Sequence, residues 1–233
     1  MKIVINNLTR MKGQHICVAG IDLDSGMHVR PLINPSRFNR EHLKIHGGPF
    51  DVSVVVQIEN AKPIGRPPEM EDYLVDPKNI KFSHYMEGET FWEVLNEACH
   101  DDLQDIFGED LERARRGYAI NLGSGSVSLG CLLPRKQPVL EIDGWGKIRL
   151  NLSNGQDEVN LSVTDLRLYK EDNATPETKI VSDVARRLSR GIRVILSVGL
   201  SRSFRAQNDT EERHWLQVNG IHLEDEPTWT IEG

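Results

Sequence analysis

The chain has 233 residues, of which 38% are hydrophobic and 27% charged, so we expect a soluble folded protein of one large domain or two small ones. The formal net charge of −7 argues against a protein that coats DNA without sequence preference. No stretch approaches the roughly 18 uncharged apolar residues of a membrane span, and residues 1–7 lack the apolar core of a secretory signal, so we expect a cytoplasmic protein with no membrane partner.

The first segment has the pattern of β-structure. Residues 17–23 and 27–33 are alternating apolar runs on either side of a glycine-containing turn, which predicts a hairpin. Pro31 has no N–H group, so the second strand should end there or lie at a sheet edge. Residues 52–58 are a further strand candidate, and the prolines within residues 62–78 predict a loop.

Residues 90–107 are predicted to form one helix. Thr90 and Glu93 have the spacing of a capping box, apolar residues recur at helical intervals, and Gly108 supplies a stop. The segment 87–112 holds ten acidic residues and no Lys or Arg, whereas the rest of the chain is close to neutral. The acidic face of this helix is either a solvated surface or a docking surface for a basic partner.

The second half of the chain again has mostly the pattern of β-structure. A second helix is expected over residues 176–190, because Thr175 can serve as N-cap and Pro176 stands at the first helical position. The strand candidates on either side of it are residues 139–142, 147–152, 159–163, 193–198 and 214–221.

This order of elements predicts a mainly β fold with two or more helices. Each half contains several short strands and one helix, without the alternation of strands and helices that builds a doubly wound sheet. We therefore expect two OB-like, partly open β-barrels packed in tandem. The first would span residues 1–118 and carry the acidic helix 90–107, and the second would span residues 119–233 and carry the helix 176–190.

Three segments carry a resemblance to a known family. They are residues 17–22 with the following Gly26-x-x-Val29-Arg30-Pro31-Leu32, the run Leu200-Ser201-Arg202-Ser203-Phe204, and the run His214-Trp215-Leu216-Gln217-Val218-Asn219-Gly220-Ile221. Together they resemble the bacterial dual OB-fold-containing domain family over nearly the whole chain. The resemblance implies two OB-like barrels and a role in nucleic-acid or nucleotide recognition, in the setting of prokaryotic defence or conflict systems. It brings no catalytic residue set with it.

The strongest functional candidate lies between residues 201 and 219. Arginine side chains bind phosphates, and aromatic rings stack on bases. On a strand, Trp215, Gln217 and Asn219 would share one face, opposite an apolar face. The alternative is a structural Trp followed by a turn after Asn219. The candidate ligand contacts here are Arg202, Arg205, His214, Trp215, Gln217 and Asn219.

A second basic set lies on and after the predicted N-terminal hairpin. OB barrels bind oligonucleotides across their second and third strands and the adjoining loops. A basic strand followed by a basic loop fits that place, and the alternative is a solvated hairpin face. The candidate contacts of this set are His28, Arg30, Arg37 and Arg40.

Metal and nucleophile chemistry find little support in the sequence. The three cysteines, Cys17, Cys99 and Cys131, form no C-x-x-C pair, which is typical of a reducing compartment and argues against a zinc site. Cys99 and His100 are neighbours on the predicted helix, so their side chains would diverge by about 100° and would not form a dyad. We expect no bound metal and no cofactor.

These features predict a binding module that performs no catalysis. Its partner would be single-stranded nucleic acid or a nucleotide, held by arginine, aromatic and amide groups. The net negative charge favours a short ligand, because few phosphates then need to be neutralised. One alternative is a protein-interaction adaptor that docks a basic partner through the acidic helix. The other is a nuclease-like enzyme, although the sequence offers no convergent acid–base set.

Overall fold

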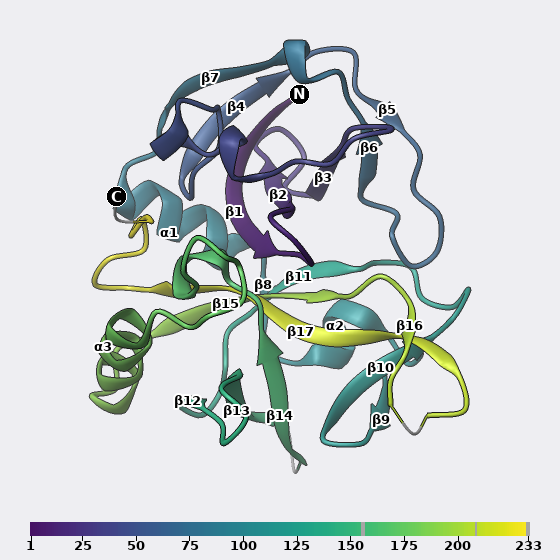
Figure 1. The fold of residues 1–233 in the computed structure, drawn as a ribbon, viewed down its shortest axis with the longest axis vertical. Coiled ribbons are helices and arrows are strands. Elements are labelled where there is room, and N and C mark those ends of the chain that lie inside the picture. Colours follow the sequence, from purple (N-terminus) through teal and green to yellow (C-terminus); the bar gives the residue numbers. More distant parts are fainter. Residues whose placement is uncertain (155–156, 208, 232–233) are drawn as a thin grey trace.

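The chain forms two curled β-sheets, one stacked on the other. The computed structural model describes residues 1–154, 157–207 and 209–231. The first sheet occupies the upper half of the molecule in Figure 1 and the second sheet the lower half. Three α-helices accompany the strands in the described residues, so the predicted mainly β fold class is confirmed.

The first sheet has the strand order β5-β6-β3-β2-β1-β4-β7. β3 and β6 run parallel, and the other neighbours run antiparallel. β5 follows β4 after residues 59–61, so the two sides of the sheet are joined through the chain into a barrel. The strands are β1 (Lys2–Arg10), β2 (Ile16–Asp22), β3 (His28–Leu32), β4 (Val54–Ile58), β5 (Lys62–Pro63), β6 (Asp72–Leu74) and β7 (Ile80–Tyr85).

The second sheet has the order β12-β13-β14-β17-β15-β11-β8, with β10 and β16 beside β17 and β9 beside β10. Its two sides are joined by residues 133–138, which connect β11 to β12. The strands are β8 (Cys99–His100), β9 (Glu112–Ala114), β10 (Gly117–Asn121), β11 (Leu129–Leu132), β12 (Val139–Ile142), β13 (Ile148–Asn154), β14 (Asp157–Val163), β15 (Val194–Leu200), β16 (Phe204–Arg205) and β17 (Glu212–Leu223).

Both sheets have the connectivity of an OB-fold barrel. The first three strands form a meander, the third pairs in parallel with the fifth, and the fourth lies between the fifth and the first. In the first barrel the fourth and fifth strands are each broken, into β4 with β5 and β6 with β7. In the second barrel the first strand is broken into β11 and β12. The prediction of tandem OB-like barrels is confirmed.

The prediction of one helix over residues 90–107 is wrong. Helix α1 (Gly88–Glu97) begins after Glu87, so Thr90 is not its N-cap. The chain then extends as β8, which pairs with β11 of the second sheet. Asp102 accepts a hydrogen bond from the Gln104 N–H group (3.0 Å) and starts a new helix, α2 (Leu103–Phe107). Pairing with a strand distant in sequence therefore overrides the helical pattern.

Two further local predictions differ from the structure. The predicted loop 62–78 contains β5 and β6, whose short runs are held by pairing with each other and with β3. The predicted helix 176–190 is α3 (Thr178–Ser189), which begins two residues later because Pro176 bridges to Tyr169. Pairing to the second sheet begins at β8 and β9, before residue 118.

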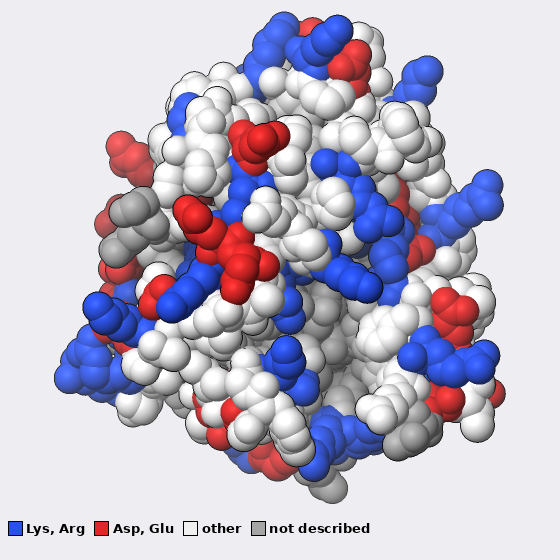
Figure 2. All heavy atoms as spheres, viewed as in Figure 1, with Lys and Arg blue, Asp and Glu red and all other residues white. Residues whose placement is uncertain are grey.

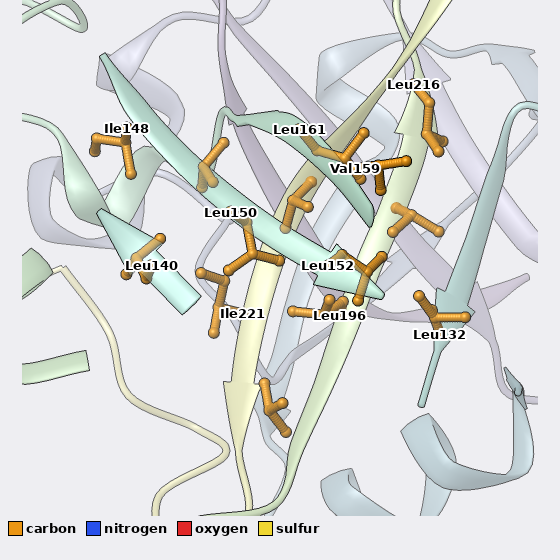
Figure 3. Close-up of a cluster of buried hydrophobic side chains, with 14 of the residues drawn as sticks. Leu132, Leu140, Ile148, Leu150, Leu152, Val159, Leu161, Leu196, Leu216 and Ile221 are labelled. Atoms are coloured by element: carbon orange, nitrogen blue, oxygen red, sulfur yellow. The ribbon is translucent and has the colours of Figure 1, made fainter. Parts of the chain in front are cut away.

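Each barrel has its own apolar core. In the second barrel, side chains from β12, β13, β14, β15 and β17 meet between the strands, among them Leu140, Leu150 and Leu161 (Figure 3). The core of the first barrel also includes Cys131 and Ile195 from the second sheet, so the two barrels pack against each other over apolar surface. No helix in the described residues has the length and apolar character needed to cross a membrane.

A buried ion pair stands behind the C-terminal half of β17. The side chains of Asp165 and Arg167 are each 1% exposed, and Arg167 Nη2 lies 2.7 Å from Asp165 Oδ2. Asp165 also accepts from the N–H group of Ile221 (2.9 Å), and the Arg167 guanidinium lies 3.7 Å from the Trp229 ring centroid. Thr9 of the first barrel forms a β-bridge with Asp165, so this pair lies where the barrels meet.

Replacing Asp165 by Ala should destabilise the protein by about 3–5 kcal/mol, because the Arg167 charge is left buried without a counterion. Urea denaturation followed by tryptophan fluorescence measures the change. The matched control is Asp183→Ala, which removes an exposed carboxylate paired with Arg186 and should cost less than about 1 kcal/mol. Equal costs for the two variants would contradict this account.

Candidate nucleic-acid interface

Carboxylates of the first barrel face polar groups of the second at the junction between them. Glu71 accepts hydrogen bonds from the N–H groups of Ser128 (2.7 Å) and Leu129 (3.2 Å), and from the Ser128 hydroxyl (2.8 Å). Asp72 forms a buried ion pair with Arg30 of β3. Arg30 also donates to Ser128 Oγ (3.1 Å). Arg30 is therefore part of the contact between the barrels.

Arg202 joins this network from the connection between β15 and β17. Its guanidinium lies 2.7 Å from Asp72 Oδ2 and 3.0 Å from Glu69 Oε1, and 49% of its side chain is exposed. Burial lowers the pKa of Arg202, but the two carboxylates more than offset this effect and raise it above its usual value. His214 of β17 is buried, with Nδ1 3.6 Å from Glu69 Oε1. The structure thus gathers Arg30, Arg202 and His214 around carboxylates.

The remaining N-terminal candidates lie apart from this network. Arg40 is buried, and its guanidinium donates to Asn173 Oδ1 (2.6 Å) and to the Lys170 carbonyl (2.8 Å) of the second barrel. Burial lowers the pKa of Arg40. Arg37 is exposed in the loop after β3, and His28 lines a surface pocket between the two barrels. The predicted N-terminal set therefore does not form one surface.

The alternation predicted for the last strand holds over part of its length. Trp215 and Gln217 are half-buried on one face of β17, and Leu216 is buried on the other. Asn219 departs from the pattern because a register shift interrupts the pairing of β15 with β17. It is buried, and its Oδ1 accepts from Thr164 Oγ1 (3.1 Å). Asn219 thus holds a bend in the barrel wall.

Aromatic and basic side chains gather around Trp215. Its Nε1 donates to the Phe204 carbonyl (3.1 Å), and the two ring centroids are 6.1 Å apart. The Arg115 guanidinium lies 5.8 Å from the Trp215 ring centroid. Arg205 is exposed on β16, next to the half-exposed Phe204 ring. This arrangement offers aromatic surface and positive charge on one side of the second barrel.

A groove of about 350 Å³ adjoins these rings, and we name it the arginine groove. It runs between the β9–β10 hairpin and the strands β13 and β14, which are the second and third strands of this OB barrel. Figure 2 shows basic side chains gathered on the lower part of this face, beside a hollow between β14 and the hairpin. The groove is lined by Arg113, Arg115, Arg116, Asn151, Glu158, Val159 and Asn160.

The charges of the groove are only partly neutralised. Arg115 lies 3.8 Å from Asp209, and Arg113 donates to the Glu158 carbonyl (2.8 Å). Within the described part of the chain, Arg116 and Arg205 form no ion pair. The sequence-based prediction of ligand contacts did not include Arg113, Arg115 and Arg116, because they lie beside the expected domain boundary at residue 118. Three arginines within four residues are the pattern that indicates a basic site here.

A model of the dual OB-containing domain family matches residues 1–221. The chain belongs to this family. The match spans both barrels and includes the arginine groove, and it confirms the resemblance found in the sequence. No curated protein and no solved structure matches the chain.

Arg30 and Arg202 both bind Asp72, but we expect them to contribute differently to stability. Arg30→Ala should destabilise the protein by about 3 kcal/mol or more, because it leaves Asp72 in a buried site without its main partner. Arg202→Ala should cost about 1 kcal/mol or less, because half of that side chain is in solvent. Thermal and urea denaturation measure both changes. A larger loss of unfolding free energy for Arg202→Ala than for Arg30→Ala would contradict this prediction.

Proposed function

We propose that the protein binds single-stranded nucleic acid or a nucleotide in the arginine groove of the second barrel, without a catalytic step. The observation that carries this proposal is the groove itself, in which three arginines of the β9–β10 hairpin face the second and third strands of an OB barrel. OB folds bind oligonucleotides on this face and on the loops beside it. In the first barrel, the loop between β5 and β6 holds Glu69 and Glu71, which bond to the second barrel.

Stacking would supply the second part of the binding energy. Trp215 and Phe204 present ring surface next to the groove, and stacking of a base on an aromatic side chain is worth about 1–3 kcal/mol. Arg115 lies between these rings and the groove, so its guanidinium can contact a phosphate while the adjacent base stacks. Such pairing of charge with ring surface favours single strands, whose bases are unstacked.

The acidic residues around the groove favour a short ligand. Asp209 and Glu158 lie close to its arginines, and Arg213 is held by Glu112 and Glu211. Contacts to a few phosphates are therefore available, whereas a long polymer would meet repulsion from an overall negative chain. A ligand of one to a few nucleotides fits this balance. The prokaryotic defence setting implied by the family resemblance stays a prediction.

Arg116→Ala should weaken binding of short labelled single strands at all sequences and should lower the slope of log K against log salt by about 0.7, since one phosphate contact is lost. Trp215→Ala should weaken binding about 10-fold with the salt slope unchanged, because it removes stacking. Fluorescence anisotropy with DNA and RNA at several salt concentrations measures both effects. A thermal-shift screen of nucleotides runs beside it.

Arg186→Ala is the matched control, because it removes an exposed arginine on α3, away from the groove. Its binding should equal that of the unmodified protein. If the groove variants bind as well as the control does, the proposed site is wrong. If the folded protein binds neither strands nor nucleotides, the adaptor alternative becomes the better hypothesis. For that alternative, Glu89, Glu93 and Glu97 are exposed on α1 and available to a basic partner.

A further inference from the structure

Two of the three cysteines lie side by side where the barrels meet. Cys99 of β8 is in parallel register with Cys131 of β11. Neighbouring strands are about 4.7–4.9 Å apart, which falls within the Cα separation of about 4.4–6.8 Å found in disulfides. Residues in register on paired strands project from the same face of the sheet, so the two thiols lie next to each other. Little backbone movement is therefore needed to join the two sulfur atoms.

The surroundings of Cys131 stabilise its thiolate. Its side chain is fully buried, and Asn6 Nδ2 donates to its Sγ (3.6 Å). The thiol of Cys99, followed by His28 and Ser197, lowers the pKa of Cys131 well below its usual value, against the effect of burial. The same contact with Cys131 raises the pKa of Cys99. Of the two thiols, that of Cys131 is therefore the more readily ionised.

A route from solvent to this pair exists. Cys99 is partly exposed and lines a surface pocket of about 440 Å³ between the two barrels. His28 and His100 line the same pocket, so polar groups accompany the thiol. An oxidant as small as a peroxide can enter a space of this size. Cys17, in contrast, lies beside Arg30 and Arg202 on the first barrel, and burial raises the pKa of its thiol.

We propose that Cys99 and Cys131 are an oxidation site that forms one disulfide when the protein meets hydrogen peroxide. Cys99, the member of the pair that lines the pocket, loses its proton and attacks a peroxide oxygen. The O–O bond breaks and the released proton completes one molecule of water, which leaves a sulfenic acid on Cys99. The Cys131 sulfur then attacks that sulfur, and the hydroxyl departs with the Cys131 proton as a second water. Two thiols and one peroxide yield one disulfide and two waters.

The bond would close the segment from Cys99 to Cys131 into a loop. This segment contains α2 and the β9–β10 hairpin, and the hairpin carries the three arginines of the arginine groove. Oxidation would therefore tie the start of that segment, in β8, covalently to its end in β11. The oxidation site stands independently of the proposed function, because its geometry involves none of the groove residues.

Intact-mass spectrometry of the folded full-length chain tests the site. The protein is treated with a slight excess of hydrogen peroxide and alkylated under denaturing conditions. We expect a loss of two hydrogens, one alkylated cysteine, and a peptide map that joins Cys99 to Cys131 with Cys17 alkylated. Because disulfides constrain the unfolded chain, the oxidised protein should also unfold at a higher temperature than the reduced protein.

Cys17→Ser is the matched control and should form the same disulfide at the same rate. Cys131→Ser should abolish the bond and the loss of two hydrogens. The proposal is overturned if oxidised protein retains three alkylatable thiols, if Cys17 enters the bond, or if the disulfide appears only after the chain has been unfolded.

Discussion

Buried carboxylates of the junction determine how the two barrels sit on one another. Glu71 is satisfied by backbone and hydroxyl donors at Ser128 and Leu129, and Asp72 by Arg30 from its own barrel and Arg202 from the other. A buried charge without its partners is costly, so any rotation of one barrel against the other would break several of these bonds together.

The same arrangement divides the arginines into two groups. Arg40 and Arg202 are bound to acceptors across the junction, and Arg30 is bound to Asp72 of its own barrel and to the Ser128 hydroxyl of the other, so all three hold the fold together. Arg113, Arg115 and Arg116 lie on the far side of the second barrel, next to exposed ring surface. A chain with an excess of acid can therefore still present a local basic site. The location of the acids, rather than their number, determines where an anion can bind.

Features that depend on residues close together in the chain could be predicted from the sequence. The β2–β3 hairpin and the burial of Leu216 and Val218 on one face of β17 follow from the local pattern, and both appear in the structure. Distant partners explain what local pattern missed. Arg40 resembles a free cation in the sequence, but its acceptor, Asn173, lies 133 residues away. Cys99 fits a helical stripe in the sequence, but pairing with Cys131 draws it into a strand.

The pairing of β17 with the much earlier strand β10 affects the order in which the chain can fold during its synthesis. The residues that line the arginine groove, all within 113–160, are synthesised before β17, but β10 pairs with the second sheet only when Arg213, His214 and Trp215 are present. The β-strands of the first barrel are complete by Tyr85, long before this step. Long-range pairing of this kind forms slowly. A nascent chain can therefore pair the strands of its first sheet early, although the core of that barrel is completed by Cys131 and Ile195, and the β9–β10 hairpin is fixed to the second sheet only when β17 is released.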